Sequence, residues 1–178
     1  MKVNFFKYGF FFLLIQVFFN SCFRDTPEKN KKIPAIDEET LLSTNRYIIQ
    51  KEVERIGNYV VRRGWDMDTT KSGLWYMIIE KGTGPDAVKG KIATIEYEIS
   101  LLDGTVCYSS EQTGPKQFVI GLGGVESGLE EGILLLNEGA EVFFILPPYL
   151  AYGIPGDQKK IPSNASLVYY LKLKRVEE

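Results

Sequence analysis

The sequence has 178 residues, the length expected of one domain with extensions. It carries 21 Lys and Arg residues against 23 Asp and Glu, and the formal net charge of −2 gives no electrostatic support for a nucleic-acid partner. Histidine is absent, which excludes histidine-based triads and removes almost every zinc-binding pattern. The two cysteines, Cys22 and Cys107, are far apart and form neither a metal-binding pattern nor a disulfide framework. We therefore expect no metal and no other cofactor.

Residues 1–21 have the features of a secretory signal peptide. Lys2 and Lys7 give a positive start, and the apolar core that follows is shorter than the roughly 20 residues that span a membrane. Cys22 comes directly after this core and resembles the lipidated cysteine of bacterial lipoproteins. An uncleaved anchor or an ordinary signal cut nearby would also fit. We expect lipid on Cys22 to anchor the chain in the bacterial cell envelope with its domain facing the periplasm. Because Phe23, not Asp, follows the cysteine, the outer membrane is favoured.

Residues 22–36 are polar, contain two prolines and are predicted to be a flexible tether. Residues 37–66 carry the long helical pattern of the sequence, in which apolar residues share one side: Leu42, Ile49, Val53, Ile56 and Val60. Two interpretations of this helical arm stay open. In the first, the helix packs on its own domain. In the second, it binds a partner, for example the same helix of a second copy in a homodimer.

Residues 67–178 have the pattern of one domain. Five segments are predicted to be strands: residues 72–79, 92–101, 106–109, 140–146 and 167–174. The second alternates most regularly, which is typical of a half-buried antiparallel strand. It predicts an inward face of Ala93, Ile95, Tyr97 and Ile99 and an outward face with Glu96 and Glu98. Strands, one helix and further strands indicate an α+β domain in which an antiparallel sheet wraps around a helix.

The short helix is predicted within residues 125–136. Its apolar face consists of Val125, Leu129, Ile133 and Leu136, and a solvated face is expected to hold Glu126, Glu130 and Glu131. Gly128 and Gly132 lie inside this pattern, where glycine costs about 1 kcal/mol relative to alanine. Something is therefore expected to approach the helix closely at these two positions. A helix this short needs a curved sheet to close over it.

Four segments between residues 72 and 176 resemble the FKBP-type peptidyl-prolyl isomerases. They read SGLWYMIIEKGTG, IEYEISLLDGTVCYSS, GLGGVESGLEEGILLLNEGAE and LPPYLAYGIPGDQKKIPSNASLVYYLKL, and the last two are the most specific. Together with the lipoprotein signal and the helical arm, they resemble the lipid-anchored FKBP proteins of Bacteroidetes, including those associated with gliding motility. The resemblance implies an antiparallel sheet of about five strands curled around one short helix, with an aromatic-lined pocket between them.

The resemblance also implies the residues of the site. Three tyrosines match the catalytic positions: Tyr97, Tyr152 and Tyr169. Among these, Tyr152 matches the residue that donates a hydrogen bond to a bound carbonyl. A second set matches the substrate-binding positions, with Glu126 contributing its backbone N–H: Cys107, Tyr108, Val125, Glu126, Leu129 and Ile161.

At several of these positions the chain departs from the family pattern. Cys107 and Tyr108 stand where the family usually reads Phe and Asp, and Leu129 stands where many members carry Trp. Lys116 and Asp157 replace residues that are often aromatic or histidine. Tyr108 supplies no negative charge near neutral pH, because an ordinary tyrosine has a pKa of about 10. We therefore expect a pocket that is wider, less aromatic and differently polarised.

Two functions follow from the resemblance. The first is a peptidyl-prolyl isomerase that assists the folding of exported or envelope proteins, with proline-containing segments as partners and gliding-motility or secretion components as candidate clients. The reaction needs no nucleophile or metal, only tighter binding of the twisted X–Pro amide than of its planar forms. The second is a weak or inactive chaperone or assembly factor that holds such segments in the same cleft. Cys107 and Tyr108 favour the second function.

Overall fold

A computed structural model describes residues 37–178, so the expected signal peptide, Cys22 and the tether of residues 22–36 lie outside the described residues. The helices are α2 (Glu38–Arg63), α3 (Ser110–Thr113), α4 (Ser127–Ile133) and the 3₁₀ turn η2 (Pro148–Leu150). The strands are β1 (Asp68–Thr69), β2 (Trp75–Glu80), β3 (Ile92–Leu101), β4 (Val106–Ser109), β5 (Lys116–Val119), β6 (Glu141–Leu146) and β7 (Leu167–Glu177). Within residues 37–178, no helix combines the length and the hydropathy that crossing a bilayer requires.

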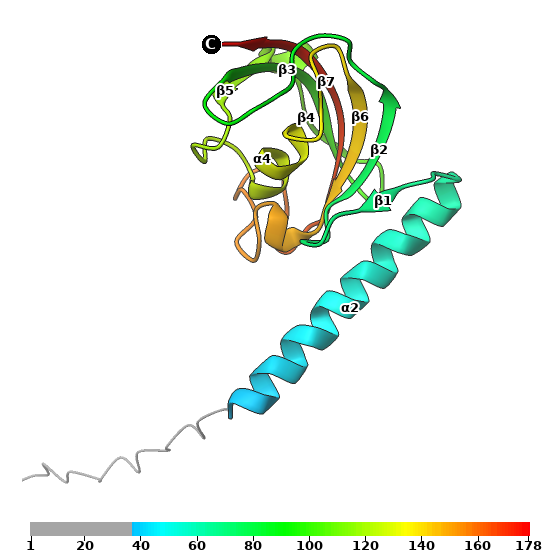
Figure 1. Cartoon of the computed structure of the whole chain (residues 1–178). Coiled ribbons are helices and arrows are strands. Elements are labelled where there is room, and N and C mark those ends of the chain that lie inside the picture. The colour runs from blue at the N-terminus through cyan, green and yellow to red at the C-terminus, as the bar shows by residue number, and fades with distance from the viewer. Residues whose placement is uncertain (1–36) are drawn as a thin grey trace, which may run out of the picture. The chain divides into compact units, whose positions relative to one another are not determined.

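The strands form one antiparallel sheet in the order β1-β2-β6-β7-β3-β4, and β5 pairs with the start of β3. The sheet curves around α4, as Figure 1 shows. The five expected strands correspond to β2, β3, β4, β6 and β7. The other two, β1 and β5, were not expected, because strands of two and four residues are too short to show alternation clearly. β4 is as short as β5, but the Asp103-Gly104 hairpin turn before it predicts a returning strand. The sheet therefore has seven strands, and the predicted α+β architecture is confirmed.

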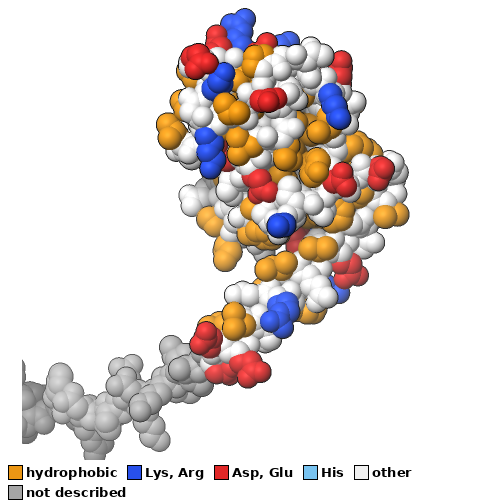
Figure 2. Space-filling model, in the orientation of Figure 1, with side chains coloured by type: hydrophobic (Ala, Val, Ile, Leu, Met, Phe, Trp, Pro, Cys, Tyr) orange, Lys and Arg blue, Asp and Glu red, His pale blue; other side chains and the backbone are white. Residues whose placement is uncertain are grey.

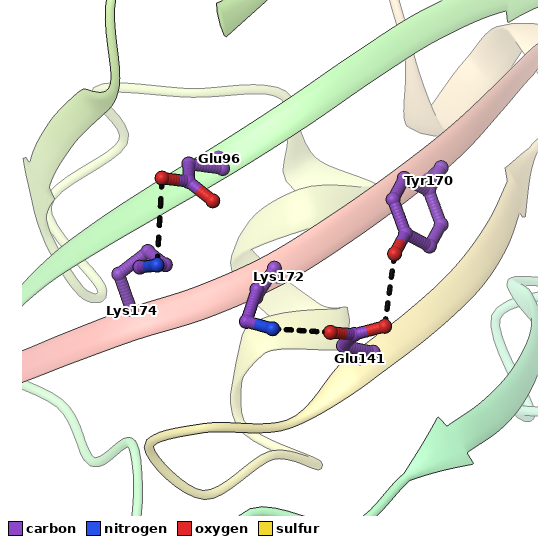
Figure 3. Close-up of polar contacts among 5 residues, drawn as sticks. All are labelled: Glu96, Glu141, Tyr170, Lys172 and Lys174. Atoms are coloured by element: carbon purple, nitrogen blue, oxygen red, sulfur yellow. Dashed lines mark hydrogen bonds and ion pairs between the residues drawn. The ribbon is translucent and has the colours of Figure 1, made fainter.

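The register of β3 places its side chains as its alternation predicts. Ala93, Ile95 and Ile99 are buried and Tyr97 is half-buried, whereas Glu98 is exposed. On the outward face, charged side chains from β3, β6 and β7 pair with one another (Figure 3). The carboxylate of Glu141 accepts hydrogen bonds from Lys172 and from the Tyr170 hydroxyl, and Glu96 forms an ion pair with Lys174 at 3.5 Å. A slip of one residue would exchange the two faces, so this burial fixes the register.

The central helix is shorter than predicted, because α4 ends at Ile133 and residues 134–136 continue as tight turns. Its two glycines face the sheet. A Cβ atom on Gly128 would lie 2.6 Å from the Leu146 side chain, and one on Gly132 would lie 2.7 Å from the Phe144 ring. Both are closer than van der Waals contact, so the expected close approach is confirmed. The sheet touches the backbone of α4 where side chains are missing.

The expectation of a solvated glutamate face is wrong for Glu126, whereas Glu130 and Glu131 are partly exposed. Glu126 is only 8% exposed, because it precedes the helix in an extended conformation and does not follow the helical period. The carboxylate of Glu130 accepts the backbone N–H groups of Gly121 and Gly123 at 2.6 and 2.9 Å. The carboxylate of Glu131 accepts the Ser72 hydroxyl at 2.6 Å. Glu130 and Glu131 therefore join α4 to the loops around it.

The long helix α2 both packs on the domain and exposes an apolar surface. Near its C-terminus, Ile56, Tyr59 and Val60 are buried in a cluster with Ile145 and Val168 from the sheet. Earlier in the helix, a set of large hydrophobic side chains is 45–61% exposed (Figure 2): Leu41, Leu42, Tyr47, Ile48, Ile49 and Val53. The interpretation that the helix packs on its own domain is confirmed for the last turns, and the role of the exposed part stays a prediction.

The packing of α4 predicts opposite effects for two glycine substitutions. Gly132→Ala should lower the free energy of unfolding by about 1–3 kcal/mol, because the new methyl group overpacks against the Phe144 ring. Gly57→Ala, inside α2, should raise it by about 0.5–1 kcal/mol, because the nearest atom lies 3.9 Å from the new Cβ. Denaturant unfolding of the full-length chain measures both. An increase in stability for Gly132→Ala would contradict the close packing of α4.

Candidate functional site

A cavity of about 340 Å³ lies between the sheet, α4 and the loop that follows η2. Five of the residues expected at the site line it: Tyr97, Tyr108, Leu129, Tyr152 and Tyr169. Five further residues complete the wall. Lys116 and Asp157 had been named as departures from the family pattern, whereas Ile95, Ile99 and Lys159 were not expected at the site. The cavity therefore combines an apolar floor with tyrosine hydroxyls and a few charged groups. Sequence reasoning missed Ile95 and Ile99 as site residues, although the inward face of β3 indicated their direction.

The floor and one wall are fixed by the sheet and α4. Leu129 on α4 and Tyr169 on β7 are each 1% exposed. Tyr97 on β3 is held at both ends, since its backbone N–H donates to Ser110 Oγ at 3.0 Å and its hydroxyl lies 3.0 Å from Thr113 Oγ1. The short helix α3 supplies both partners, so the ring of Tyr97 has a defined position on the wall. An apolar ring entering the cavity would meet these three side chains.

A carboxyl group lies behind two of the tyrosines. Burial raises the pKa of Tyr152 well above its ordinary value, and the neighbouring carboxyl of Glu126 adds to this effect. Burial likewise raises the pKa of Tyr169, with a further contribution from Glu126. Both phenols therefore stay protonated over the whole physiological range, and each keeps an O–H to donate. Glu126 was expected to act through its backbone N–H, and the structure adds its side chain to the surroundings of Tyr152.

Besides Glu126, three expected substrate-binding residues do not line the cavity. Cys107 and Ile161 are 1% and 2% exposed, and Val125 packs at the edge of the core. Adjacent residues of a strand point to opposite faces, so Cys107 cannot share a wall with Tyr108. Its thiol lies 3.5 Å from the carbonyl oxygen of Lys160, toward which it donates. These three residues support the cavity wall from behind.

A carboxylate enters the cavity from the loop. The hydroxyl of Tyr108 donates a hydrogen bond to Asp157 Oδ2, while Asp157 Oδ1 accepts the backbone N–H groups of Lys159 and Ile161 at 2.9 and 2.8 Å. Partial burial acts to raise the pKa of Asp157, but these hydrogen bonds outweigh it, and the pKa lies below its ordinary value. Position 108 thus lacks a carboxylate, as expected, yet the pocket has one from a residue 49 positions away.

Besides the carboxylate of Asp157, the cavity wall holds two positively charged side chains, Lys116 from β5 and Lys159 from the loop. The Nζ atom of Lys160 lies 5.1 Å from the centroid of the Tyr108 ring. Within residues 37–178, no group of three His, Cys, Asp or Glu side chains is arranged to hold a metal ion. The arrangement suits a ligand with an apolar ring beside a carbonyl group, because it offers apolar contact and hydroxyl donors together.

Comparisons with known proteins agree with this geometry. The model of the FKBP-type peptidyl-prolyl cis-trans isomerase family matches residues 84–174. A probable FKBP-type isomerase FkpA of Neisseria meningitidis serogroup B is 45% identical over 109 residues, 61% of this chain and 39% of that protein. An FK506-binding protein of the same strain is 34% identical over 107 residues, 60% of this chain and 98% of that protein.

A solved structure and a further relative extend the comparison. The crystal structure of AtFKBP13 matches with a TM-score of 0.59 at 32% identity, covering 61% of this chain and 96% of that one. FkpA of Escherichia coli K12 is 31% identical over 108 residues, 59% of this chain and 38% of its own length. The chain thus spans only about two fifths of the FkpA relatives that it matches, 39% and 38% in these two cases.

Proposed function

The chain belongs to the FKBP-type peptidyl-prolyl cis-trans isomerase family, and we propose that its cavity isomerises X–Pro bonds in exported polypeptides. The observation that carries this proposal is the cavity itself, in which the Tyr152 hydroxyl stands beside an apolar floor formed by Leu129. A proline ring fits the floor, and the carbonyl that precedes it can accept the Tyr152 O–H.

The chemistry requires binding rather than covalent catalysis. The X–Pro bond prefers trans by only about 0.5–1 kcal/mol, but a barrier of roughly 18–20 kcal/mol separates the isomers, because the twisted bond loses its amide resonance. A site accelerates the exchange when it binds the twisted amide more tightly than either planar form. The planar amide is the more polar state and loses more on transfer from water, so a water-poor cavity favours the twisted one. Tyr152 then holds the carbonyl while the ring turns.

We place this activity in the bacterial cell envelope. The apolar segment before Cys22 supports export, and a lipid on Cys22 would hold the domain at the membrane, with the outer membrane favoured over the inner. The FkpA relatives are bacterial proteins, which fits this placement. The clients would be proline-containing segments of exported or envelope proteins, including gliding-motility or secretion components. The proposal that gliding-motility or secretion components are clients is based on the combination of lipoprotein signal, helical arm and isomerase domain.

The exposed part of α2 is the proposed dimer contact. Leu42, Ile49 and Val53 lie on the side of α2 that, near its C-terminus, buries Ile56 and Val60 against the domain, yet they are 45–56% exposed. A second α2 helix presents the same apolar stripe, so pairing of two copies would cover both at once. The membrane anchor would raise the local concentration of the chain and favour such pairing.

A non-catalytic holding function is the second candidate. The observation that favours it is the charge in the cavity wall, where Lys116, Lys159 and Asp157 keep the site partly hydrated. A hydrated site binds planar and twisted amides more equally, and equal binding produces no acceleration. Under this alternative the protein binds proline-containing segments with no turnover.

The catalytic proposal predicts a large effect of a single hydroxyl. Tyr152→Phe should lower kcat/KM on a proline tetrapeptide about tenfold, equal to about 1.4 kcal/mol of barrier, because the bound carbonyl loses its donor. Tyr149→Phe is the matched control, since this neighbouring tyrosine is 47% exposed and does not line the cavity. FK506, for which one relative is named, should inhibit the full-length chain. If the native chain binds the peptide but isomerises it no faster than the uncatalysed reaction, the catalytic proposal fails and the holding function takes its place.

The anchoring proposal predicts the fate of a cysteine variant. Cys22→Ser should remove the chain from the membrane fraction, because the thiol that would carry the lipid is gone. Fractionation of the producing cells, with metabolic labelling by a fatty-acid analogue, measures this. The native chain should incorporate the label and the variant should not. A variant that stays membrane-bound and is processed like the native chain would rule out lipidation.

The dimer proposal predicts a change in mass. The double variant Ile49→Glu, Val53→Glu should convert a dimer into a monomer with an unchanged melting temperature, because both side chains are exposed within one chain. Val61→Glu is the control, since Val61 is 79% exposed but lies outside the apolar stripe. Sedimentation of the full-length chain in detergent gives the mass. A monomeric native chain at micromolar concentration would overturn this proposal.

A further inference from the structure

Two walls of the cavity are joined by several contacts between β4 and the loop of residues 153–161. The central one is the hydrogen bond from the Tyr108 hydroxyl to Asp157 Oδ2. Beside it, Lys160 Nζ lies 5.1 Å from the centroid of the Tyr108 ring, and the Cys107 thiol donates to the Lys160 carbonyl at 3.5 Å. β4 has four residues and lies at the edge of the sheet, and its contacts with the loop therefore determine how far apart these walls stand.

The loop depends on Asp157 for its own shape. Gln158 has a φ of +59°, in the left-handed region that residues other than glycine seldom adopt. The backbone N–H groups on the far side of this turn, those of Lys159 and Ile161, both donate to Asp157 Oδ1. One oxygen of this carboxylate therefore shapes the turn, and the other receives the Tyr108 hydroxyl. Asp157 connects the loop conformation to the opposite wall.

This loop begins immediately after Tyr152. Its start is tied back by hydrogen bonds at Gly153, whose backbone N–H donates to Pro148 and whose carbonyl accepts from Asn164. Its far part is held by the buried side chain of Ile161 and by the hydrogen bonds through which Asp157 meets β4 and closes its own turn. We propose that Tyr108 and Asp157 form a positioning pair, which sets the width of the cavity and holds the loop so that the Tyr152 hydroxyl is aimed at the substrate carbonyl.

This inference rests on the proposed isomerase function and adds two residues to it. Neither residue has to touch the reacting amide, since the effect passes through the position of Tyr152. A carboxylate next to a second carboxylate is repelled, so Tyr108→Asp should lower activity although it introduces the acid at position 108. The removal of either partner leaves the other without its hydrogen bond at the cavity wall.

The pair also predicts a pH dependence. Hydrogen bonds from Tyr108 and from the loop backbone hold the pKa of Asp157 below its ordinary value. The pair is therefore intact at neutral pH and is lost only as pH falls through this lowered pKa. Without the Tyr108 hydroxyl the pKa rises, so the acid-side loss of kcat/KM moves to higher pH. The other charged or titratable groups around the cavity are Lys116 from β5, Lys159 and Lys160 from the loop, Cys107 from β4, Tyr97 from β3, Tyr152, Tyr169 and Glu126.

The test is a double-mutant cycle on the full-length chain with Tyr108→Phe, Asp157→Asn and both together. Asp157→Asn keeps an oxygen for the backbone N–H groups and an amide that can meet Tyr108, but it removes the charge. Tyr170→Phe is the matched control, because its hydroxyl donates to Glu141 at 2.9 Å on the outward face of the sheet (Figure 3). The readouts are the melting temperature and kcat and KM on a proline tetrapeptide, measured from neutral pH down to below the ordinary pKa of an aspartate, about 3.9.

Tyr108→Phe should lower kcat/KM about tenfold, mainly through kcat, with a melting temperature close to that of Tyr170→Phe. The double variant should lose no more activity than the worse single variant, and Asp157→Asn should abolish the acid-side step. That last outcome separates Asp157 from Glu126, which all these variants retain. The positioning pair would be overturned if the two single losses of kcat/KM multiplied in the double variant. It would also be overturned if Tyr108→Phe were as active as Tyr170→Phe.

Hydrogen exchange separates this inference from the proposed function. In Tyr108→Phe, the amide protons of Lys159 and Ile161 should exchange faster than in the native chain, and Tyr170→Phe should leave them unchanged. If the native chain shows no isomerase activity, the proposed function is wrong. The hydrogen-exchange rates of Lys159 and Ile161 still test whether Tyr108 and Asp157 form the positioning pair. Unchanged exchange of both amides in Tyr108→Phe overturns the pair whatever the activity.

Discussion

The close contact between α4 and the sheet is the constraint on which the rest of the domain depends. At Gly128 and Gly132 the sheet reaches the helix backbone, and the side chains of Leu146 and Phe144 occupy the space that a Cβ would need. This contact fixes the height of the helix over the sheet. Leu129, between the two glycines, is thereby placed at the floor of the cavity. A bulkier residue at either glycine would lift the helix and open the site.

Two tyrosine hydroxyls of the cavity are held by partners within the chain. Tyr97 meets Thr113, Tyr108 meets Asp157, and Tyr152 lies beside Glu126. The hydroxyls of Tyr97 and Tyr108 therefore have a defined direction before a substrate arrives, which reduces the ordering that binding requires. The buried hydroxyl of Tyr169 has no hydrogen-bond partner among the described residues. The result is an apolar floor bordered by tyrosine hydroxyls and a few charged groups, with no activated nucleophile among the described residues. Such a site is suited to a reaction in which only the shape and the solvation of the substrate change.

The sequence predicted the features that depend on local periodicity and missed those that depend on distant contacts. The alternation of β3 predicted its buried face, and the glycines of α4 predicted a close approach. The burial of Glu126 was missed because the helical period was extended to a residue that precedes the helix. Asp157 was named as a departure from the family pattern, but its hydrogen bond with Tyr108 was missed, because the two residues are 49 positions apart and no local pattern links them. The strands β1 and β5 were too short to show a period.

The central claim is that the cavity itself lowers the barrier to X–Pro isomerisation. NMR exchange spectroscopy of a proline peptide with catalytic amounts of the full-length chain in detergent tests it most directly. The cis–trans exchange rate of the peptide should rise with the amount of chain. Chemical-shift changes in the protein should centre on Tyr97, Leu129, Tyr152 and Tyr169. An unchanged exchange rate, with shift changes confined to the exposed apolar residues of α2, would contradict the claim.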